Sequence, residues 1–127
     1  MNNQVIELAI KMCKKAHAPF SNYRVGAAAE IITGEIVGGC NVESSSYSLT
    51  CCAERVALFK AITEGYCKFK SMAIATKNTG MPCGACRQVI WELCGNIPIY
   101  ICNMHGLVKT IFSSELLPDA FDKNDLQ

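Results

Sequence analysis

Three cysteines and one glutamate are the residues of this chain whose types and spacing point to chemistry. Cys52 and Glu54 lie two positions apart, and Cys83 and Cys86 follow later as a CxxC pair. Three thiolates fill three of the four tetrahedral positions of zinc and leave the fourth for water, as in catalytic rather than structural zinc sites. A carboxylate two residues from a ligand can reach that water and exchange protons with it. The spacing therefore predicts a zinc ion on Cys52, Cys83 and Cys86, with Glu54 as the catalytic residue.

Two alternatives bear on the choice of ligands. Cys51 is adjacent to Cys52, and either thiol could coordinate a metal, but only Cys52 places Glu54 two positions downstream. Cys51 is therefore expected to be a packed free thiol. A structural zinc of the ribbon type needs a second CxxC pair, and the sequence has one such pair, Cys83 and Cys86. The structural-zinc interpretation is weak but stays open.

The charge of the predicted ligand set requires compensation. Three thiolates outweigh the charge of Zn²⁺ and make its bound water less acidic than a histidine-containing ligand set would. Arg55 directly follows Glu54 and can offset this charge by donating hydrogen bonds to the zinc-bound sulfurs. The alternative for Arg55 is an ordinary solvent-facing position on a helix.

The elements that position these residues follow from the hydrophobic pattern. Apolar residues at three- and four-residue spacing predict a helix over about 3–16. The β-type runs 25–32 and 35–41 are close enough for an antiparallel hairpin, in which Gly38-Gly39 marks a bulge or a close backbone approach. The remaining expectations are helices at 52–64 and 85–94, strands at 71–76, 98–102 and 107–112, a short terminal helix capped by Ser114, and a frayed polar tail at about 122–127.

This order of elements defines the expected fold. The 127 residues are about the size of one domain, so we expect a single domain over 1–127. Its fold class is α/β, a three-layer α/β/α arrangement around a mixed five-stranded sheet. The connection 103–106 is too short for a parallel crossover, so the last strand should be antiparallel to its neighbour. Cys52 and Cys83 then stand at two helix N-termini, where the helix dipole and free amides favour thiolates.

The composition limits which binding partners and which cellular location are expected. Twelve basic and eleven acidic residues give a formal net charge of +1 without any basic cluster longer than Lys14-Lys15, so no nucleic-acid partner is expected. No apolar run reaches membrane-spanning length and no signal-peptide pattern begins the chain, which predicts a cytoplasmic protein without membrane association. The odd number of cysteines, nine, favours reduced thiols over disulfides.

Five ordered motifs extend over most of the chain: PFSNYRVGAA at 19–28, GCNVE at 39–43, CAER at 52–55, PCGACRQ at 82–88 and ELLPDAF at 115–121. Together they resemble the cytidine deaminases of the small homotetrameric class with three cysteine ligands. The resemblance implies the cytidine deaminase fold, one zinc per chain, and hydrolytic deamination of cytidine and deoxycytidine to uridine and deoxyuridine plus ammonia. In that reaction the zinc-activated water attacks C4 while Glu54 shuttles protons, and the enzyme serves pyrimidine salvage.

The resemblance also implies roles for residues that chemistry alone does not single out. Asn41 and Glu43 match family residues that bind the ribose hydroxyls, and Tyr23 and Ala53 match positions that contact the nucleoside. Phe121 matches an aromatic residue that reaches the active site of a neighbouring subunit in the homotetramer. Without the family, Asn41 and Glu43 are polar residues at a strand end, Tyr23 is core and Phe121 anchors a terminal helix.

Three other functions remain as alternatives. Ser44-Ser45 replace the asparagine and alanine common in the family, so a different aminopyrimidine nucleoside, such as a blasticidin-type antibiotic, is a possible substrate. Nucleic-acid editing shares the zinc motif, but the short 103–106 connection and the absent basic patch argue against it. A non-catalytic zinc-binding module is disfavoured because Glu54, Asn41 and Glu43 are all present.

Overall fold

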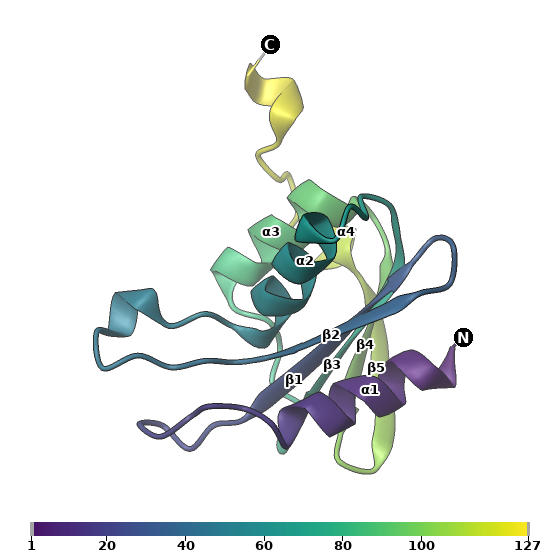
Figure 1. Ribbon diagram of the computed structural model, residues 1–127. Coiled ribbons are helices and arrows are strands. Elements are labelled where there is room, and N and C mark those ends of the chain that lie inside the picture. The colour runs from purple at the N-terminus through teal and green to yellow at the C-terminus, as the bar shows by residue number, and fades with distance from the viewer. Residues whose placement is uncertain (1, 127) are drawn as a thin grey trace.

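The computed structural model describes residues 2–126 and contains one mixed sheet (Figure 1). Its strands are β1 (Val25–Ile31), β2 (Ile36–Cys40), β3 (Phe69–Thr76), β4 (Pro98–Asn103) and β5 (Gly106–Phe112). Its helices are α1 (Asn3–Cys13), α2 (Ala53–Thr63), α3 (Gly84–Cys94) and α4 (Ser113–Leu116), with 3₁₀ turns η1 (Tyr47–Leu49) and η2 (Lys123–Leu126). The strand order is β2-β1-β3-β4-β5, with β3 and β4 parallel and the other pairs antiparallel. The predicted five-stranded mixed sheet and antiparallel last strand are confirmed.

Helices cover both faces of the sheet and complete the predicted three layers. Figure 1 shows α1 on one face and α2 and α3 on the other. Apolar residues of α1, such as Val5 and Ala9, pack with Ala28 and Ala73 of the sheet. On the opposite face, Leu58 of α2 belongs to the larger core cluster, which also takes in α3, α4 and residues of β1 to β4, with Ile111 of β5 packed against it. No helix within residues 2–126 combines the length and apolar character that crossing a membrane requires.

Two glycines set how closely the helices approach the sheet. A Cβ on Gly39 would lie 2.5 Å from the backbone nitrogen of Ala57 in α2, and a Cβ on Gly26 would overlap the carbonyl oxygen of Ala9 in α1. The β1–β2 register runs without interruption from Gly26↔Cys40 to Glu30↔Ile36, so Gly39 marks a close backbone approach rather than a bulge. This approach seats α2 directly on the sheet, with its N-terminus beside the ends of β1 and β2.

The first helix is shorter than predicted. It ends at Cys13 instead of Ala16, and a turn at Lys14-Lys15 follows. The backbone of His17 pairs instead with the segment after β2, accepting from the Glu43 amide at 2.8 Å and donating to the Asn41 carbonyl at 2.9 Å. This long-range pairing outweighs the helical periodicity that continues to Ala16.

The C-terminal region departs from the expectation for the last helix. Ser114 does not cap the last helix, because α4 begins at Ser113 with Phe112 in the cap position. The carboxylate of Glu115 accepts the Phe112 amide at 3.2 Å, and the Ser114 amide is satisfied by Asn96 instead. Within the tail expected to fray over 122–127, Lys123–Leu126 form the 3₁₀ turn η2, and residue 127 lies outside the described residues. The fraying stays a prediction.

Candidate active site

The three predicted ligands meet at the starts of two helices. Cys52 and Cys83 occupy the N-cap positions of α2 and α3, and Cys86 lies in the first turn of α3. All three Sγ atoms lie within 4.8 Å of one another, and those of Cys52 and Cys83 are 3.8 Å apart. A tetrahedral zinc with Zn–S bonds of about 2.3 Å requires sulfurs separated by about 3.8 Å. The cluster therefore has the dimensions and donor set of a zinc site, and Cys51 does not belong to it.

Two of the three thiols lie at the starts of helices. The Cys52 and Cys83 carbonyls accept the first hydrogen bonds of their helices, from Val56 and Arg87, each at 3.0 Å. The amides of the first turn have no partner within a helix and carry its positive dipole end, which stabilises nearby anions. The expectation that two of the thiols lie at helix N-termini is confirmed.

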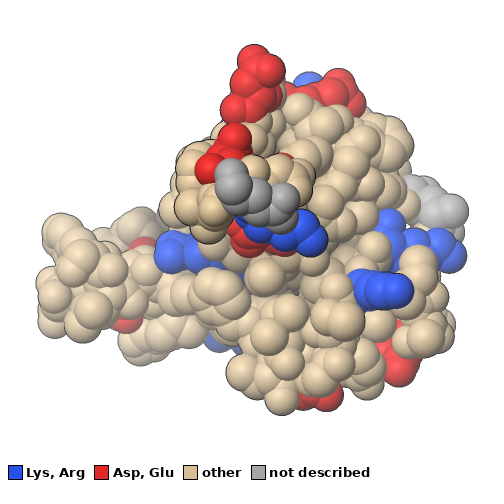
Figure 2. Space-filling view, turned by 90° about the horizontal axis from the view of Figure 1, so that it is seen from above, with Lys and Arg blue, Asp and Glu red and all other residues tan. Residues whose placement is uncertain are grey.

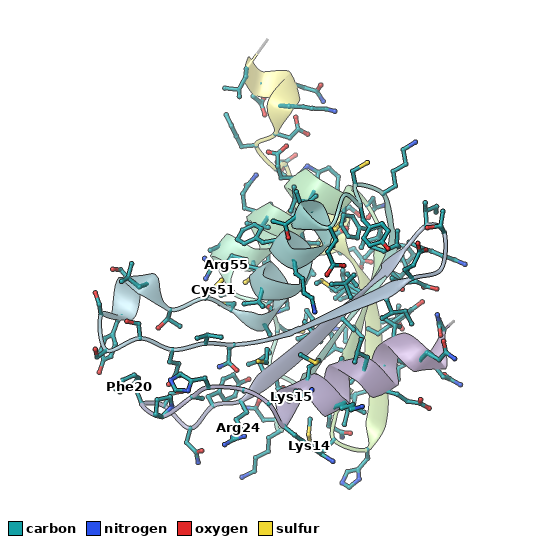
Figure 3. The ribbon with its side chains drawn as sticks, in the orientation of Figure 1. Lys14, Lys15, Phe20, Arg24, Cys51 and Arg55 are labelled. Carbon is teal, nitrogen blue, oxygen red and sulfur yellow. The ribbon has the colours of Figure 1, made fainter. Side chains whose placement is uncertain are left out.

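Arg55 contacts the cluster directly. Its Nη2 donates to the Cys52 Sγ at 3.3 Å, while its Nε is buried without a hydrogen-bond partner among the described residues. Figure 3 labels Arg55 and Cys51 near the N-terminal end of α2. A hydrogen bond from the Cys86 thiol, and next that from Arg55, lowers the pKa of Cys52 to about 5 against the opposing effect of burial. The same Cys86–Cys52 hydrogen bond raises the pKa of Cys86, so Cys52 is the preferred thiolate.

Glu54 is a buried carboxylic acid next to the cluster. Its side chain is 4% exposed, and burial raises the pKa of its carboxyl group. A carboxyl group whose pKa lies nearer to neutrality is better suited to accept and release protons. Glu54 thus lies beside the ligands, and its carboxyl group holds a proton more readily than that of an exposed glutamate.

A pocket of about 160 Å³ opens onto this group. Its walls bring together five of the predicted site residues: Tyr23, Asn41, Cys52, Glu54 and Cys83. The other lining residues are Val25, Thr50, Ile74, Thr76, Gly80 and Met81. Thr50 also lines a neighbouring hollow of about 350 Å³ that contains Glu43 and Ser44. The pocket at the thiols is thus small, and a wider hollow shares Thr50 with it.

The segments that carry Tyr23, Asn41 and Glu43 lie outside helices and strands and form one side of the site, the loop wall. Asn41 and Glu43 hold this wall through contacts to the backbone. Asn41 is 6% exposed; its Oδ1 accepts the Val25 amide at 2.9 Å and its Nδ2 donates to the Tyr23 carbonyl at 2.8 Å. Glu43 accepts the Phe20 and Ser21 amides at 2.9 and 3.1 Å and also the Ser21 hydroxyl. The Ser21 hydroxyl is the main cause that lowers the pKa of Glu43, so this carboxylate is charged. Asn41 lines the pocket itself, whereas Glu43 lines the neighbouring hollow.

Tyr23 belongs to a polar network that the sequence did not reveal. Its hydroxyl donates to Asn78 Oδ1 at 2.9 Å, Thr76 donates to the same oxygen at 3.4 Å, and the Gly80 amide donates to Thr76 at 2.8 Å. A Cβ on Gly80 would overlap the Tyr23 hydroxyl. The available signal was the polar run that follows β3 directly before the CxxC motif, which placed side chains at a sheet edge beside two ligands.

Arg87 ties the CxxC loop to the C-terminal region. Its Nε donates to the Pro82 carbonyl at 2.8 Å, and its Nη1 donates to the Leu116 carbonyl at 3.0 Å. Pro82 directly precedes the ligand Cys83, so this contact fixes the backbone that presents the thiol. The sequence contained Arg87 within a quoted motif but gave no indication of this contact.

Two further predicted site residues lie outside the pocket wall. Ala53 is fully buried in the core cluster at the first position of α2. Phe121 is 57% exposed, and its carbonyl accepts Gln88 Nε2 at 2.8 Å. The segment that carries Phe121 extends away from the helical layer (Figure 1). The roles of both residues stay predictions.

A three-thiol metal site at two helix N-termini, with a buried carboxylic acid in the same pocket of an α/β/α fold, defines a zinc-dependent hydrolase of the deaminase type. Residues 1–102 match the family described as the cytidine and deoxycytidylate deaminase zinc-binding region. The chain therefore belongs to the cytidine deaminase family, and its cofactor is zinc.

Individual relatives agree with this assignment over nearly the whole chain. A cytidine deaminase of Sporosarcina psychrophila is 46% identical over 119 residues, covering 91% of this chain and 88% of the relative. One from Halalkalibacterium halodurans is 44% identical over 125 residues, covering 96% and 95%. The crystal structure of cytidine deaminase from Burkholderia pseudomallei has a TM-score of 0.89 at 44% identity and covers 95% of this chain and 99% of that one.

Proposed function

We propose that this chain catalyses the hydrolytic deamination of cytidine and deoxycytidine, giving uridine or deoxyuridine and ammonia. The observation that carries this proposal is the shared pocket of Glu54 and the metal-binding thiols Cys52 and Cys83. Relatives at 44–46% identity that are named cytidine deaminases support the choice of substrate.

The chemistry divides between the cofactor and Glu54. Zinc, when bound by Cys52, Cys83 and Cys86, supplies a water molecule that loses a proton near neutral pH. Glu54 takes up that proton and transfers it to N3 of the cytosine ring as the water oxygen adds to C4. It then takes the proton that remains on this oxygen and passes it to the amine, so that the C4–N bond breaks and ammonia leaves. The Arg55 guanidinium draws electron density from the Cys52 sulfur through its hydrogen bond, which favours an acidic water.

We propose that the loop wall binds the nucleoside. The Tyr23 ring lines the pocket and offers an aromatic face to the pyrimidine. Asn41 retains one amide hydrogen and one oxygen lone pair beyond its two backbone contacts, and the Glu43 carboxylate has spare acceptor sites. These groups are suited to the ribose hydroxyls, with Ala53 contributing at the base of α2.

We further propose that residues 1–127 form one deaminase domain that assembles into a homotetramer in the cytoplasm and serves pyrimidine salvage. Exposed apolar side chains support assembly: Tyr47 is 78% exposed, Leu49 72% and Phe121 57%. The loop that carries Phe20, labelled in Figure 3, projects from the body, and the same side of the molecule shows mostly uncharged residues in Figure 2. Burial of these groups, with Phe121 entering a neighbouring site, would complete the pocket.

The test combines metal content, mass and turnover on one preparation. We expect about one zinc per chain, a native mass near four chains, and conversion of cytidine to uridine followed by ultraviolet absorbance. The Glu54→Gln variant should keep its zinc. Its activity should fall by about 10²- to 10⁴-fold, because the proton shuttle is removed. Near-normal turnover by Glu54→Gln would remove Glu54 from the mechanism.

Substrate preference needs a separate comparison. Ser44 lies in the hollow beside Glu43, where the outer part of a nucleoside would enter. We expect kcat/KM to be highest for cytidine and deoxycytidine. A higher kcat/KM for a blasticidin-type substrate would replace the proposed substrate while leaving the reaction type in place.

A further inference from the structure

A larger hollow, of about 700 Å³, shares Tyr23 with the catalytic pocket. Lys14, Arg24 and Lys77 line it, and no aspartate or glutamate does. Asn78 and Met104 also contribute to its wall. Three cationic residues thus line one concave surface of a chain whose formal net charge is only +1.

The cations are available to a ligand. Arg24 Nη1 donates to the Lys14 carbonyl at 3.0 Å, which holds the guanidinium at the end of α1 and leaves its other N–H groups free. Figure 3 labels Lys14 and Arg24 at this same end of the molecule. Cys13 also lines the hollow, and burial raises the pKa of its thiol, so it adds no competing negative charge.

We propose that this hollow binds a nucleoside 5′-monophosphate, with the phosphate among Lys14, Arg24 and Lys77 and the base against Tyr23 and Met104. Converging cations that can donate several hydrogen bonds suit a dianionic phosphate. An aromatic ring and a thioether suit a planar heterocycle. The volume lies within the range of small-molecule sites and far exceeds that of phosphate alone.

The shared wall couples this hollow to the catalytic pocket. Tyr23 and Asn78, which are joined by a 2.9 Å hydrogen bond, both line the hollow, and Tyr23 also lines the pocket. A nucleotide that holds this pair therefore fixes one wall of the nucleoside site. On the basis of the proposed deaminase function, the nucleotide should lower the KM for cytidine and leave kcat unchanged.

Calorimetry on the zinc-loaded protein tests the site independently of catalysis. Saturating uridine first occupies the catalytic pocket, and uridine 5′-monophosphate or inorganic phosphate is then titrated in. We expect the nucleotide to bind despite the uridine, and phosphate to bind at least about tenfold more weakly because it leaves the apolar wall unfilled. Competition between nucleotide and uridine for a single site, or equal binding of phosphate and nucleotide, would overturn the proposal.

Charge-removing variants locate the binding. Lys14 and Lys77 are exposed, so Lys14→Gln and Lys77→Gln should fold normally, and each should weaken nucleotide binding by about tenfold. Lys60→Gln is the matched control, because it removes the same charge from α2 on the other face of the sheet. Wild-type affinity in both hollow variants would exclude this site.

Measurements of KM with and without the nucleotide test the nucleotide site and the deaminase function separately. The nucleotide should lower the KM for cytidine about threefold in the wild type and not in the Lys14→Gln/Lys77→Gln double variant. Nucleotide binding without a KM change would overturn the coupling and support the site alone. Absence of any cytidine turnover would instead contradict the proposed function, while the calorimetric result would still decide the site.

Discussion

Cys52, Cys83 and Cys86 project from the N-cap or first turn of two helices, whereas Tyr23, Asn41 and Glu43 project from segments outside helices and strands. The helices that carry these thiols are held by core packing. The position of each thiol in the cluster follows from the position of its helix. The loop residues are held by one another, since Asn41 binds the backbone of Tyr23 and Glu43 binds that of Ser21. One wall of the site is thus positioned by regular elements and the other by side-chain contacts to loop backbone.

The difference predicts two kinds of failure. On the metal wall, loss of one thiol removes a ligand while the helices that present the others remain packed. On the loop wall, loss of one polar group leaves a backbone group of another segment without a partner. Substitutions in the two regions should therefore separate metal binding from nucleoside binding and stability.

The largest effect is expected from adjacent cysteines that differ in role. Cys52→Ser should lose most of its zinc and at least about 10³-fold in activity, because a hydroxyl is a poor substitute for a thiolate ligand. Cys51→Ser should keep about one zinc per chain and most of its activity. Metal analysis and the cytidine assay check both variants. Zinc loss from Cys51→Ser alone would reverse the assignment of the ligand.

Asn41→Ala should destabilise the protein and impair nucleoside binding together. The substitution removes both backbone contacts and leaves the Val25 amide unpaired, at a cost of about 1–3 kcal/mol in the free energy of unfolding. Urea denaturation measures that cost, and KM should rise while zinc content stays the same. Asn124→Ala in the exposed tail is the control, with an expected change within about 0.5 kcal/mol. Unchanged stability of Asn41→Ala would mean that the loop wall is held by other contacts.

These two walls also explain what the sequence could predict. Cys52, Glu54, Cys83 and Cys86 were identifiable because ligand spacing and helix starts are local properties of the chain. Thr50, Thr76 and Gly80 were missed because they reach the pocket only through the pairing of β3 with β1 and the path of two loops.

The limits of the predicted helices have the same origin. The apolar spacing predicts the end of α1 three residues too late, since the competing partner of His17 lies beyond β2 in the sequence. The residue type of Ser114 predicts a helix cap, but the Glu115 carboxylate makes the capping contact. Short-range pattern fixed the order of the elements, while long-range contacts fixed their ends.

A smaller effect is expected where Tyr23 meets Gly80. Tyr23→Phe removes only the hydroxyl bond to Asn78 and should raise KM about two- to fivefold with a stability change below about 1.5 kcal/mol. Gly80→Ala should be more damaging, because its Cβ would overlap that hydroxyl. Combining the two should relieve the overlap, so a double-mutant cycle of KM and unfolding free energies should show a coupling of about 0.5 kcal/mol or more. Strict additivity would show that the two residues do not contact.

The smallest effect concerns Glu30, at the end of β1 far from the ligands. Burial opposes its ionisation, but hydrogen bonds from Asn2 at 2.9 Å and Ser71 at 2.7 Å outweigh it and lower the pKa of Glu30. A lowered pKa contributes stability that is complete above the unfolded value of about 4.3 and is lost as the pH falls through the folded value.

Glu30→Gln should therefore lose less stability than the wild type between pH 6 and 3.5, while zinc content and KM at neutral pH stay unchanged. Urea midpoints of both proteins at each pH measure the difference. Equal acid sensitivity would show that Glu30 has the same pKa in the folded and unfolded chain.

The division of the thiols between α2 and α3 has a consequence for biosynthesis. Cys52 and Cys83 are 31 positions apart, and β3 lies between them in the chain. While the chain is being synthesised and α3 has not yet emerged from the ribosome, only one thiol of the cluster, Cys52, is present. Such a chain cannot hold the metal in the mature geometry. Metal loading must therefore follow the emergence of α3 and the docking of both helices on the sheet, so zinc content reports how much of a preparation has completed its fold.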